Sequence, residues 1–168
     1  YTYVQSEVIR FTADGTWVNF DQSSGEISGS MMSEVITGST LKTDKIKGGA
    51  GNDTFKIDSG FDTITDLSGS DILIVSSGAT VSASGIDAFT ATSNTKNDGT
   101  ANLTTDNDGG TINMEASSSG AFTLTGGAGD DTLVGNGGSD KIYGMGGADT
   151  ITGNAGTDTI VGGDGDDI

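Results

Sequence analysis

Aspartates recur every nine residues near the C-terminal end of the chain, and glycines surround each of them. From Gly126 to Ile168 the sequence reads GGAGDDTLV GNGGSDKIY GMGGADTIT GNAGTDTIV GGDGDDI. Carboxylates at regular spacing, next to main-chain carbonyls that glycine leaves uncovered, are the oxygen ligands that hard cations prefer. The chemistry that this pattern predicts is therefore metal binding.

The candidate ligands fall at fixed positions when each nine-residue unit is counted from its first glycine. Position one is Gly126, Gly135, Gly144, Gly153 and Gly162. Position four is Gly129, Gly138, Gly147, Gly156 and Gly165. Position six is Asp131, Asp140, Asp149, Asp158 and Asp167. Position two varies more, and we count its glycines, Gly127 and Gly163, among the candidate ligands.

Each unit reads as a six-residue turn followed by a three-residue strand. Glycine and asparagine tolerate the positive φ angles of tight turns, so Met145 at position two departs from the pattern. Side chains alternate along a strand, which turns the aliphatic residue at position eight inward. These residues are Leu133, Ile142, Ile151 and Ile160. Two units then form an 18-residue coil with a strand on each side, and successive coils stack at about 4.8 Å.

This stacking places aspartates directly above one another: Asp149 above Asp131, Asp158 above Asp140, and Asp167 above Asp149. Bare carboxylates at about 5 Å repel by about 3 kcal/mol at an effective dielectric constant near 20, so a cation should lie between them. Zinc favours His or Cys, and magnesium retains water in a strict octahedron, whereas calcium accepts carboxylates and carbonyls together. We therefore predict several bound Ca²⁺ ions. The alternative is a metal-free solenoid in which the aspartates form Asx turns.

A first, less regular array precedes this one. Asp44, Asp53, Asp62 and Asp71 are nine residues apart, and Ile46, Phe55, Ile64 and Leu73 follow each by two. Only one turn has the full set of candidate ligands, which are Gly48, Gly49, Gly51 and Asp53. Paired with residues 66–71, and so with Asp71, it predicts a further calcium site. The turn at 39–44 contains no glycine, which favours a structural role.

The remaining segments are less informative. Around Asp14-Gly15 the sequence predicts a β-hairpin with Phe11 opposite Val18. We divide the chain into an N-terminal β region at 1–38, the first array at 39–74, an irregular β-rich connecting segment at 75–125, and the second array at 126–168, truncated at its C-terminus. Residues 106–109 (DNDG) resemble the start of an EF-hand loop, but the closing Glu and the flanking helices are missing.

Composition excludes several classes of function. The 168 residues carry a net charge of −17, which argues against nucleic acid as a partner. Cysteine and histidine are absent, so thiolate or imidazole zinc sites and Ser/His/Asp catalysis are impossible. We expect no enzyme activity in this chain, and no apolar run is long enough for a membrane span. The chain starts at Tyr1 and stops within a repeat, so we expect it to be part of a longer protein.

The unit GGxGxDxUx, in which U is a large aliphatic residue, resembles the RTX (repeats-in-toxin, or hemolysin-type) calcium-binding repeat. The resemblance implies an all-β fold, a right-handed parallel β-roll or β-helix solenoid that is disordered without calcium. It also implies type I secretion from Gram-negative bacteria and an extracellular location. Such repeats occur in enzymes, toxins, adhesins and surface-layer proteins, so the repeat alone does not identify the function.

Two arrays joined by a Thr/Ser/Ala/Asn-rich segment are similar to bacterial surface-layer (S-layer) proteins of the RTX type. Our first hypothesis is therefore a self-assembling cell-surface structural protein that calcium stabilises, with a cell-surface glycan or lipopolysaccharide as a further candidate partner. The alternative is a calcium-dependent folding and secretion module of a type I-secreted enzyme, toxin or adhesin, with any catalytic residues outside this chain.

Overall fold

The fold is described by a computed structural model covering residues 10–11, 17–18, 26–38 and 43–168. Within these ranges every regular element is a β-strand. The strands are β1 (Arg10–Phe11), β2 (Trp17–Val18), β3 (Glu26–Ser28), β4 (Val35–Thr37), β5 (Lys45–Lys47), β6 (Thr54–Ile57), β7 (Phe61–Ile64), β8 (Ile72–Val75), β9 (Thr80–Ile86), β10 (Ala88–Thr90), β11 (Lys96–Asn97), β12 (Thr100–Thr105), β13 (Thr111–Asn113), β14 (Phe122–Thr125), β15 (Thr132–Val134), β16 (Lys141–Gly146), β17 (Thr150–Thr152) and β18 (Thr159–Asp164).

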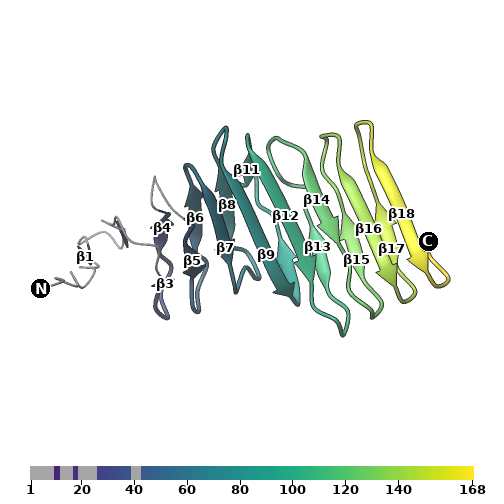
Figure 1. The fold of residues 1–168 in the computed structure, drawn as a ribbon, viewed down its shortest axis with the longest axis horizontal. Coiled ribbons are helices and arrows are strands. Elements are labelled where there is room, and N and C mark those ends of the chain that lie inside the picture. Colours follow the sequence, from purple (N-terminus) through teal and green to yellow (C-terminus); the bar gives the residue numbers. More distant parts are fainter. Residues whose placement is uncertain (1–9, 12–16, 19–25, 39–42) are drawn as a thin grey trace, which may run out of the picture.

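From β3 onward the strands stack along one long axis as a two-layer solenoid (Figure 1). One layer is a parallel eight-stranded sheet in the order β18-β16-β14-β12-β9-β7-β5-β3. The facing layer consists of two parallel four-stranded sheets, β11-β8-β6-β4 and β10-β13-β15-β17. The chain alternates between the layers, and each complete coil adds one strand to each layer, except that β10 and β11 both follow β9 in the facing layer. This confirms the predicted all-β, parallel β-roll fold.

The length of a coil follows from the strand register. In both arrays paired residues are 18 apart in the sequence, as in Leu133↔Ile151 and Phe55↔Leu73. In residues 75–125 the coils are longer, as the pairs Leu103↔Leu124 (21 apart) and Phe89↔Ile112 (23 apart) show. The nine-residue period is therefore lost in this segment because its coils are longer and differ in length. The eight-stranded sheet runs through the segment by way of β9 and β12.

A narrow apolar core separates the two layers. In the second array Leu133 and Ile142, at repeat position eight, are fully buried, as the alternation of side chains predicts. Ile151 is partly buried, and Ile160 is 49% exposed because β18 ends its sheet and no coil covers it. In the first array the corresponding residues are all fully buried: Ile46, Phe55, Ile64 and Leu73.

The predicted hairpin is present, but its predicted register is wrong. Strands β1 and β2 are antiparallel, with Phe11 opposite Trp17 and Arg10 opposite Val18. Phe11 was expected opposite Val18. With Phe11 paired to Trp17, an odd number of residues lies between the partners, which a two-residue turn at Asp14-Gly15 cannot accommodate. The other residues of the predicted hairpin lie outside the described ranges.

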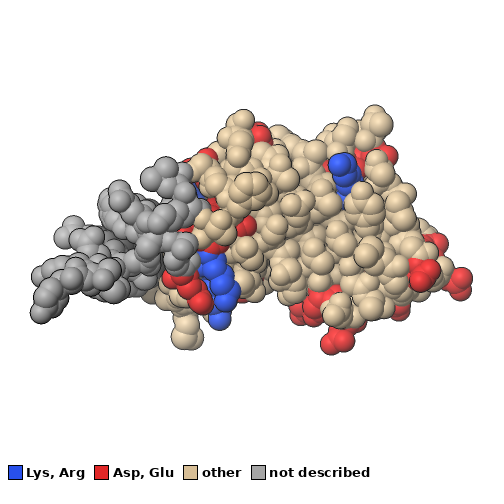
Figure 2. All heavy atoms as spheres, viewed as in Figure 1, with Lys and Arg blue, Asp and Glu red and all other residues tan. Residues whose placement is uncertain are grey.

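Two rows of turns connect the layers. The first edge consists of turns that leave the eight-stranded sheet, at 29–34, 48–53, 66–71, 105–110, 126–131, 144–149 and 162–167. The second edge, where the chain returns, includes the turns at 117–122, 135–140 and 153–158. Acidic side chains gather along the lower edge of Figure 2 towards the C-terminal end, where the first-edge turns carry exposed Asp108, Asp130, Asp164 and Asp166.

Candidate metal centre

The position-six aspartates stack as the sequence predicts, and each is held by the coil next to it. The amide of Asp131 donates to Asp149 Oδ1 at 2.9 Å, and the amide of Asp149 donates to Asp167 Oδ1 at 3.0 Å. On the second edge the amide of Asp140 makes the same bond to Asp158 Oδ1, at 2.9 Å. One oxygen of each upper carboxylate therefore has a structural role, which the sequence argument missed because it treated the carboxylates as bare.

The second carboxylate oxygen, Oδ2, is what remains for a metal ion, and its environment differs between turns. In turns 126–131 and 135–140 it accepts a hydrogen bond from the amide at position two, from Gly127 to Asp131 at 2.7 Å and from Asn136 to Asp140 at 2.8 Å. In turn 144–149, Asp149 Oδ2 is buried and has no hydrogen-bond partner. The second array thus contains two turns in which an amide hydrogen bond occupies Oδ2, which we call closed. At least one turn lacks such a bond, and we call it open.

The backbone at position two accounts for this difference. In the open turn Met145 has φ +80°, and in the next two turns Asn154 and Gly163 also have positive φ. Gly127 and Asn136, whose amides donate, do not. The departure noted at Met145 therefore falls on a turn with left-handed geometry, which costs a residue with a Cβ atom about 1–2 kcal/mol.

The open turn passes a physical test for a cation. A Cβ atom at Gly144 would collide with both Asp149 Oδ2 and the carbonyl oxygen of Gly162, so these two oxygens converge on one face of Gly144. Neither oxygen can donate a hydrogen bond to the other, because both are acceptors. Two partly or fully negative oxygens held together away from water need a positive partner, and hard oxygen donors fit calcium.

The same convergence recurs at position one of the neighbouring turns. A Cβ atom at Gly126 would meet Asp131 Oδ2 and the Gly144 carbonyl, and one at Gly135 would meet Asp140 Oδ2 at 2.5 Å and the Gly153 carbonyl at 2.8 Å. Within the described residues no three acidic side chains converge on one point. Calcium bound here must therefore take several ligands from main-chain carbonyls, as the glycine positions predict.

The carboxyl of the open turn, Asp149, has a shifted pKa. Burial raises the pKa of Asp149 above its ordinary value, and the charges of Asp131, Asp167 and Asp130 add to this, while the amide of Asp131 opposes it. A carboxyl in this situation either takes up a proton or binds a cation. At neutral pH a bound cation is the better solution, because it satisfies the carboxylate without protonation.

The first array is stacked in the same way. The amide of Glu34 donates to Asp53 Oδ1 and the amide of Asp53 to Asp71 Oδ1, both at 2.8 Å. The pKa of Asp53 is raised to about 6, mainly by burial, while the Glu34 amide opposes the rise and the nearby charges of Asp71 and Glu34 add to it. Asp71 Oδ2 accepts from the Ser68 amide at 2.9 Å, so this turn is closed.

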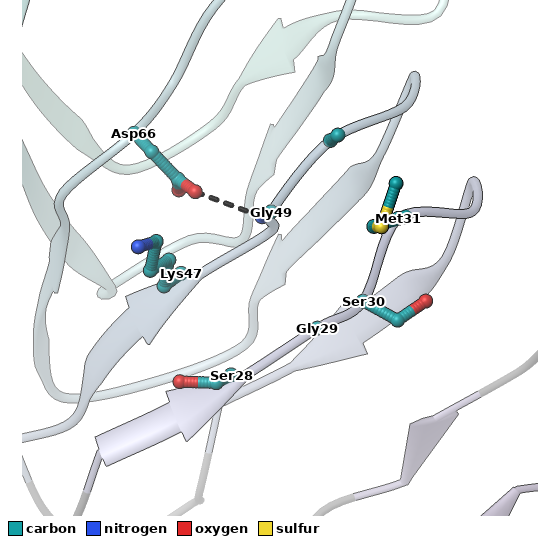
Figure 3. A pocket seen from close by; sticks show the side chains of 8 residues that line it. Ser28, Gly29, Ser30, Met31, Lys47, Gly49 and Asp66 are labelled. Atoms are coloured by element: carbon teal, nitrogen blue, oxygen red, sulfur yellow. Dashed lines mark hydrogen bonds between the residues drawn. The ribbon is translucent and has the colours of Figure 1, made fainter.

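Asp66 lies in the next coil, above the predicted site of the first array. Its two oxygens accept the amides of Gly48 and Gly49, each at 2.8 Å, and Figure 3 shows the bond from Gly49. These bonds border an open hollow of about 640 Å³ that is also lined by Met31 and Lys47. The structure brings Asp53, Asp66 and Asp71 into adjacent turns, and their role as calcium ligands remains a prediction. The turn at 39–44 lies mostly outside the described residues.

Three further turns occupy the same columns, although the sequence analysis did not find them. They are 29–34, 105–110 and 117–122, with Glu34, Gly110 and Phe122 at position six. The Phe122 amide donates to Asp140 Oδ1 at 2.7 Å, which fixes its place in the column. A search that keyed on aspartate could not detect these turns. Residues 106–109, compared above with an EF-hand, belong to a turn between β12 and β13.

Comparison with known proteins agrees with this geometry. The family model described as the RTX calcium-binding nonapeptide repeat matches in four copies, at residues 42–64, 48–80, 123–151 and 134–168. Together these matches span about half of the chain. No curated protein and no solved structure matches the chain. The nonapeptide turns, the parallel β-roll and the family match lead to one conclusion: the chain belongs to the family of RTX calcium-binding repeat proteins.

Proposed function

We propose that this chain is a calcium-dependent structural part of a self-assembling bacterial surface layer. The observation that carries the calcium-binding part is the convergence of Asp149 Oδ2 and the Gly162 carbonyl on Gly144, without a hydrogen-bond donor for Asp149 Oδ2. Calcium bound between coils would rigidify a solenoid whose second array completely buries only two apolar side chains, those of Leu133 and Ile142. Rigidity of this kind is what a surface lattice requires.

In this proposal, copies of the calcium-bound solenoid associate with one another, and the particle size measured in the calcium titration tests that association.

The proposal includes neither catalysis nor a membrane span. The chain contains no histidine and no cysteine, which removes the commonest general base and nucleophile pairs. None of the described residues forms a helix with the length and hydropathy needed to cross a bilayer. RTX repeat proteins are generally secreted, which agrees with an extracellular, surface location for this chain. A surface glycan or lipopolysaccharide is the anchoring partner that we propose.

A calcium titration into the millimolar range tests this function. Circular dichroism follows β-structure and light scattering follows particle size in the same sample, with Mg²⁺ as the control ion. We expect a gain of β-structure with Ca²⁺ only, together with growth into large assemblies. The same transition in a particle that stays monomeric would instead support a folding and secretion module of an enzyme, toxin or adhesin. No response to calcium would refute the role of the metal.

A further inference from the structure

Turn 105–110 lies directly beneath turn 126–131 on the first edge and departs from the repeat at both ends. Thr104 pairs with Thr125, so Thr105 stands at position one, where Gly126 stands in the next coil. The amide of Gly110 donates to Asp131 Oδ1 at 2.7 Å, the bond that position six makes elsewhere. Threonine and glycine therefore replace the glycine and aspartate of the repeat.

This exchange keeps an oxygen atom inside the turn. In the repeat, the position-one Cα faces the position-six carboxylate, and a Cβ atom at Gly126 would lie 2.6 Å from Asp131 Oδ2. In turn 105–110 the threonine side chain extends from position one towards position six, and its Cβ lies 3.0 Å from the place of a Cβ at Gly110. The Thr105 side chain thus fills the region that the carboxylate of the repeat occupies.

The hydroxyl of Thr105 has no partner in this region. Thr105 is 4% exposed, and its Oγ1 atom is buried without a hydrogen bond. A buried hydroxyl left unsatisfied costs about 1–3 kcal/mol, and valine would fill the same volume without this cost. A ligand that accepts the oxygen lone pairs would remove the penalty.

The charge around the turn identifies the kind of ligand. Asp106 and Asp108 lie in the lower turn, and Asp130 and Asp131 in the upper one. The sequence has no Lys or Arg from residue 97 to residue 140. Asp106 is half-buried and Asp108 is exposed. Asp106 Oδ1 accepts a hydrogen bond from the Asp108 amide at 3.1 Å. Hydroxyl, carboxylate and carbonyl oxygens in an acidic setting suit a hard cation.

We propose that turns 105–110 and 126–131 hold a calcium ion between them, with the Thr105 hydroxyl in the place of the position-six carboxylate. This site lies outside the GGxGxD pattern and extends the calcium column of the first edge into the segment between the two arrays. It rests on the proposed calcium binding of the repeats. Asp106, Asp108 and Asp131 supply the negative charge that a neutral hydroxyl lacks.

The test counts calcium ions per chain by equilibrium dialysis and isothermal titration calorimetry, with circular dichroism as a check of folding. We expect Thr105→Val to bind about one ion fewer than the wild type, because one site loses a ligand. Thr105→Ser keeps the hydroxyl and should bind the wild-type number. Thr104→Val, which removes a hydroxyl from the opposite side of β12, is the matched control and should also bind the wild-type number.

Surface variants test the site independently of the core. Asp106→Asn and Asp108→Asn should each weaken the binding of one calcium ion, while the other ions bind as before. Asp98→Asn, which removes a charge from an exposed ion pair with Lys96, should leave calcium binding unchanged. The inference is overturned if T105V binds the wild-type number of calcium ions with unchanged affinities. If T105V does not fold, the same result for both D106N and D108N overturns it. A wild type that binds no calcium would instead refute the proposed function itself.

Discussion

The two carboxylate oxygens of Asp149 have different roles. Oδ1 accepts the amide of Asp131, which fixes the register between coils, and Oδ2 is buried without a partner beside the Gly162 carbonyl. Asp149 also lies in the middle of its column, between Asp131 and Asp167. Its charge therefore contributes to the environment of two predicted calcium sites.

Replacing Asp149 with Asn keeps the Oδ1 acceptor and removes the charge. We expect Asp149→Asn to raise the calcium concentration for half-maximal folding at least about tenfold, equivalent to about 1.4 kcal/mol. Asp167→Asn, which has one neighbour in the described column, should raise it less. Calcium titration followed by circular dichroism measures both midpoints. Equal midpoints for D149N and the wild type would contradict shared ligation in the column.

Met145 bears a conformation that favours glycine. Its φ of +80° costs about 1 kcal/mol, and its side chain is 56% exposed, so little packing is lost with it. We expect Met145→Gly to stabilise the calcium-bound protein by up to about 1 kcal/mol in urea denaturation. Asn136→Gly is the control at the same repeat position. It should destabilise, because Asn136 lacks positive φ and its Oδ1 accepts the Gly138 amide at 2.7 Å.

Asp62 predicts how stability depends on pH without calcium. Its pKa is raised to about 6, mainly by burial, while the hydrogen bond from the Asp44 amide opposes the rise and the charge of Asp44 adds to it. A raised carboxyl pKa favours the folded state when the group is protonated. This contribution is fully present below the ordinary pKa of 3.8 and is lost as pH rises through about 6.

In chelator, the melting temperature should therefore rise as pH falls from 7 to 5, while calcium affinity falls because protons compete for the carboxylates. The buried Asp53 and Asp71, whose pKa values are also raised, act in the same direction. Asp62→Asn keeps the acceptor for the Asp44 amide and should reduce the rise. A melting temperature that falls over this pH range would contradict the assignment.

At the scale of the strands, the residue at repeat position eight contributes different amounts to stability in different coils. Ile142 is fully buried, whereas Ile160, in the last strand of its sheet, is half-exposed. Truncating a buried isoleucine to alanine costs about 2–5 kcal/mol, partly through the cavity that remains. We expect Ile142→Ala to lose that much stability in urea with calcium present, and Ile160→Ala to lose less than about 1 kcal/mol. Similar losses would show that an additional coil covers Ile160.

The sequence predicts those turns that contain the glycines and aspartate of the repeat. It does not predict turns that only the stacking of coils defines. The nine-residue spacing of Asp131, Asp140 and Asp149 was enough to predict the coil length, the inward position and the columns. Turns with Gly110 or Phe122 at position six have no such signal, because the carboxylate that receives their amide belongs to the next coil. The lower residue contributes only its backbone N–H to this hydrogen bond, so it can be of any type except proline.

The hairpin register and the amide bonds of the aspartates were not predictable for related reasons. Phe11 pairs with Trp17 because of the length of the connection, which the Asp14-Gly15 dipeptide does not determine uniquely. Likewise, a sequence shows that Asp131 and Asp149 are 18 residues apart, but not which atoms meet. The structure adds that one oxygen of Asp149 is already bonded to the Asp131 amide.

At the scale of the whole molecule, the solenoid has two kinds of coil. Residues 126–168 bury Leu133 and Ile142 and otherwise rely on glycine turns and aspartates. The coils between 72 and 125 bury many more apolar side chains, namely Leu73, Val75, Ala79, Val81, Ala83, Ile86, Phe89, Ala91, Ala101, Leu103, Ile112, Met114, Phe122 and Leu124. In a solenoid each coil contacts only its neighbours, so stability varies along the axis.

This distribution predicts that calcium controls one end of the molecule more than the middle. A buried Leu or Phe stabilises by about 1.5–3 kcal/mol without any metal, so β9, β12 and β14 retain a core when calcium is removed. In β16, β17 and β18 the carboxylates repel one another, and few apolar contacts oppose that repulsion. Calcium removal should therefore unfold residues 126–168 at a lower chelator concentration than residues 72–125.

Amide hydrogen exchange with mass spectrometry measures this difference directly. In excess calcium we expect protection throughout β5 to β16; in excess chelator, peptides from β16 to β18 should exchange within seconds while those from β9 and β12 stay protected for much longer. The variant Phe89→Ala, which removes a fully buried side chain from the middle, is the control and should abolish that residual protection. Simultaneous loss of protection in both regions of the wild type would show that the solenoid folds as a single calcium-dependent unit, with an apolar core too weak to stand without the metal.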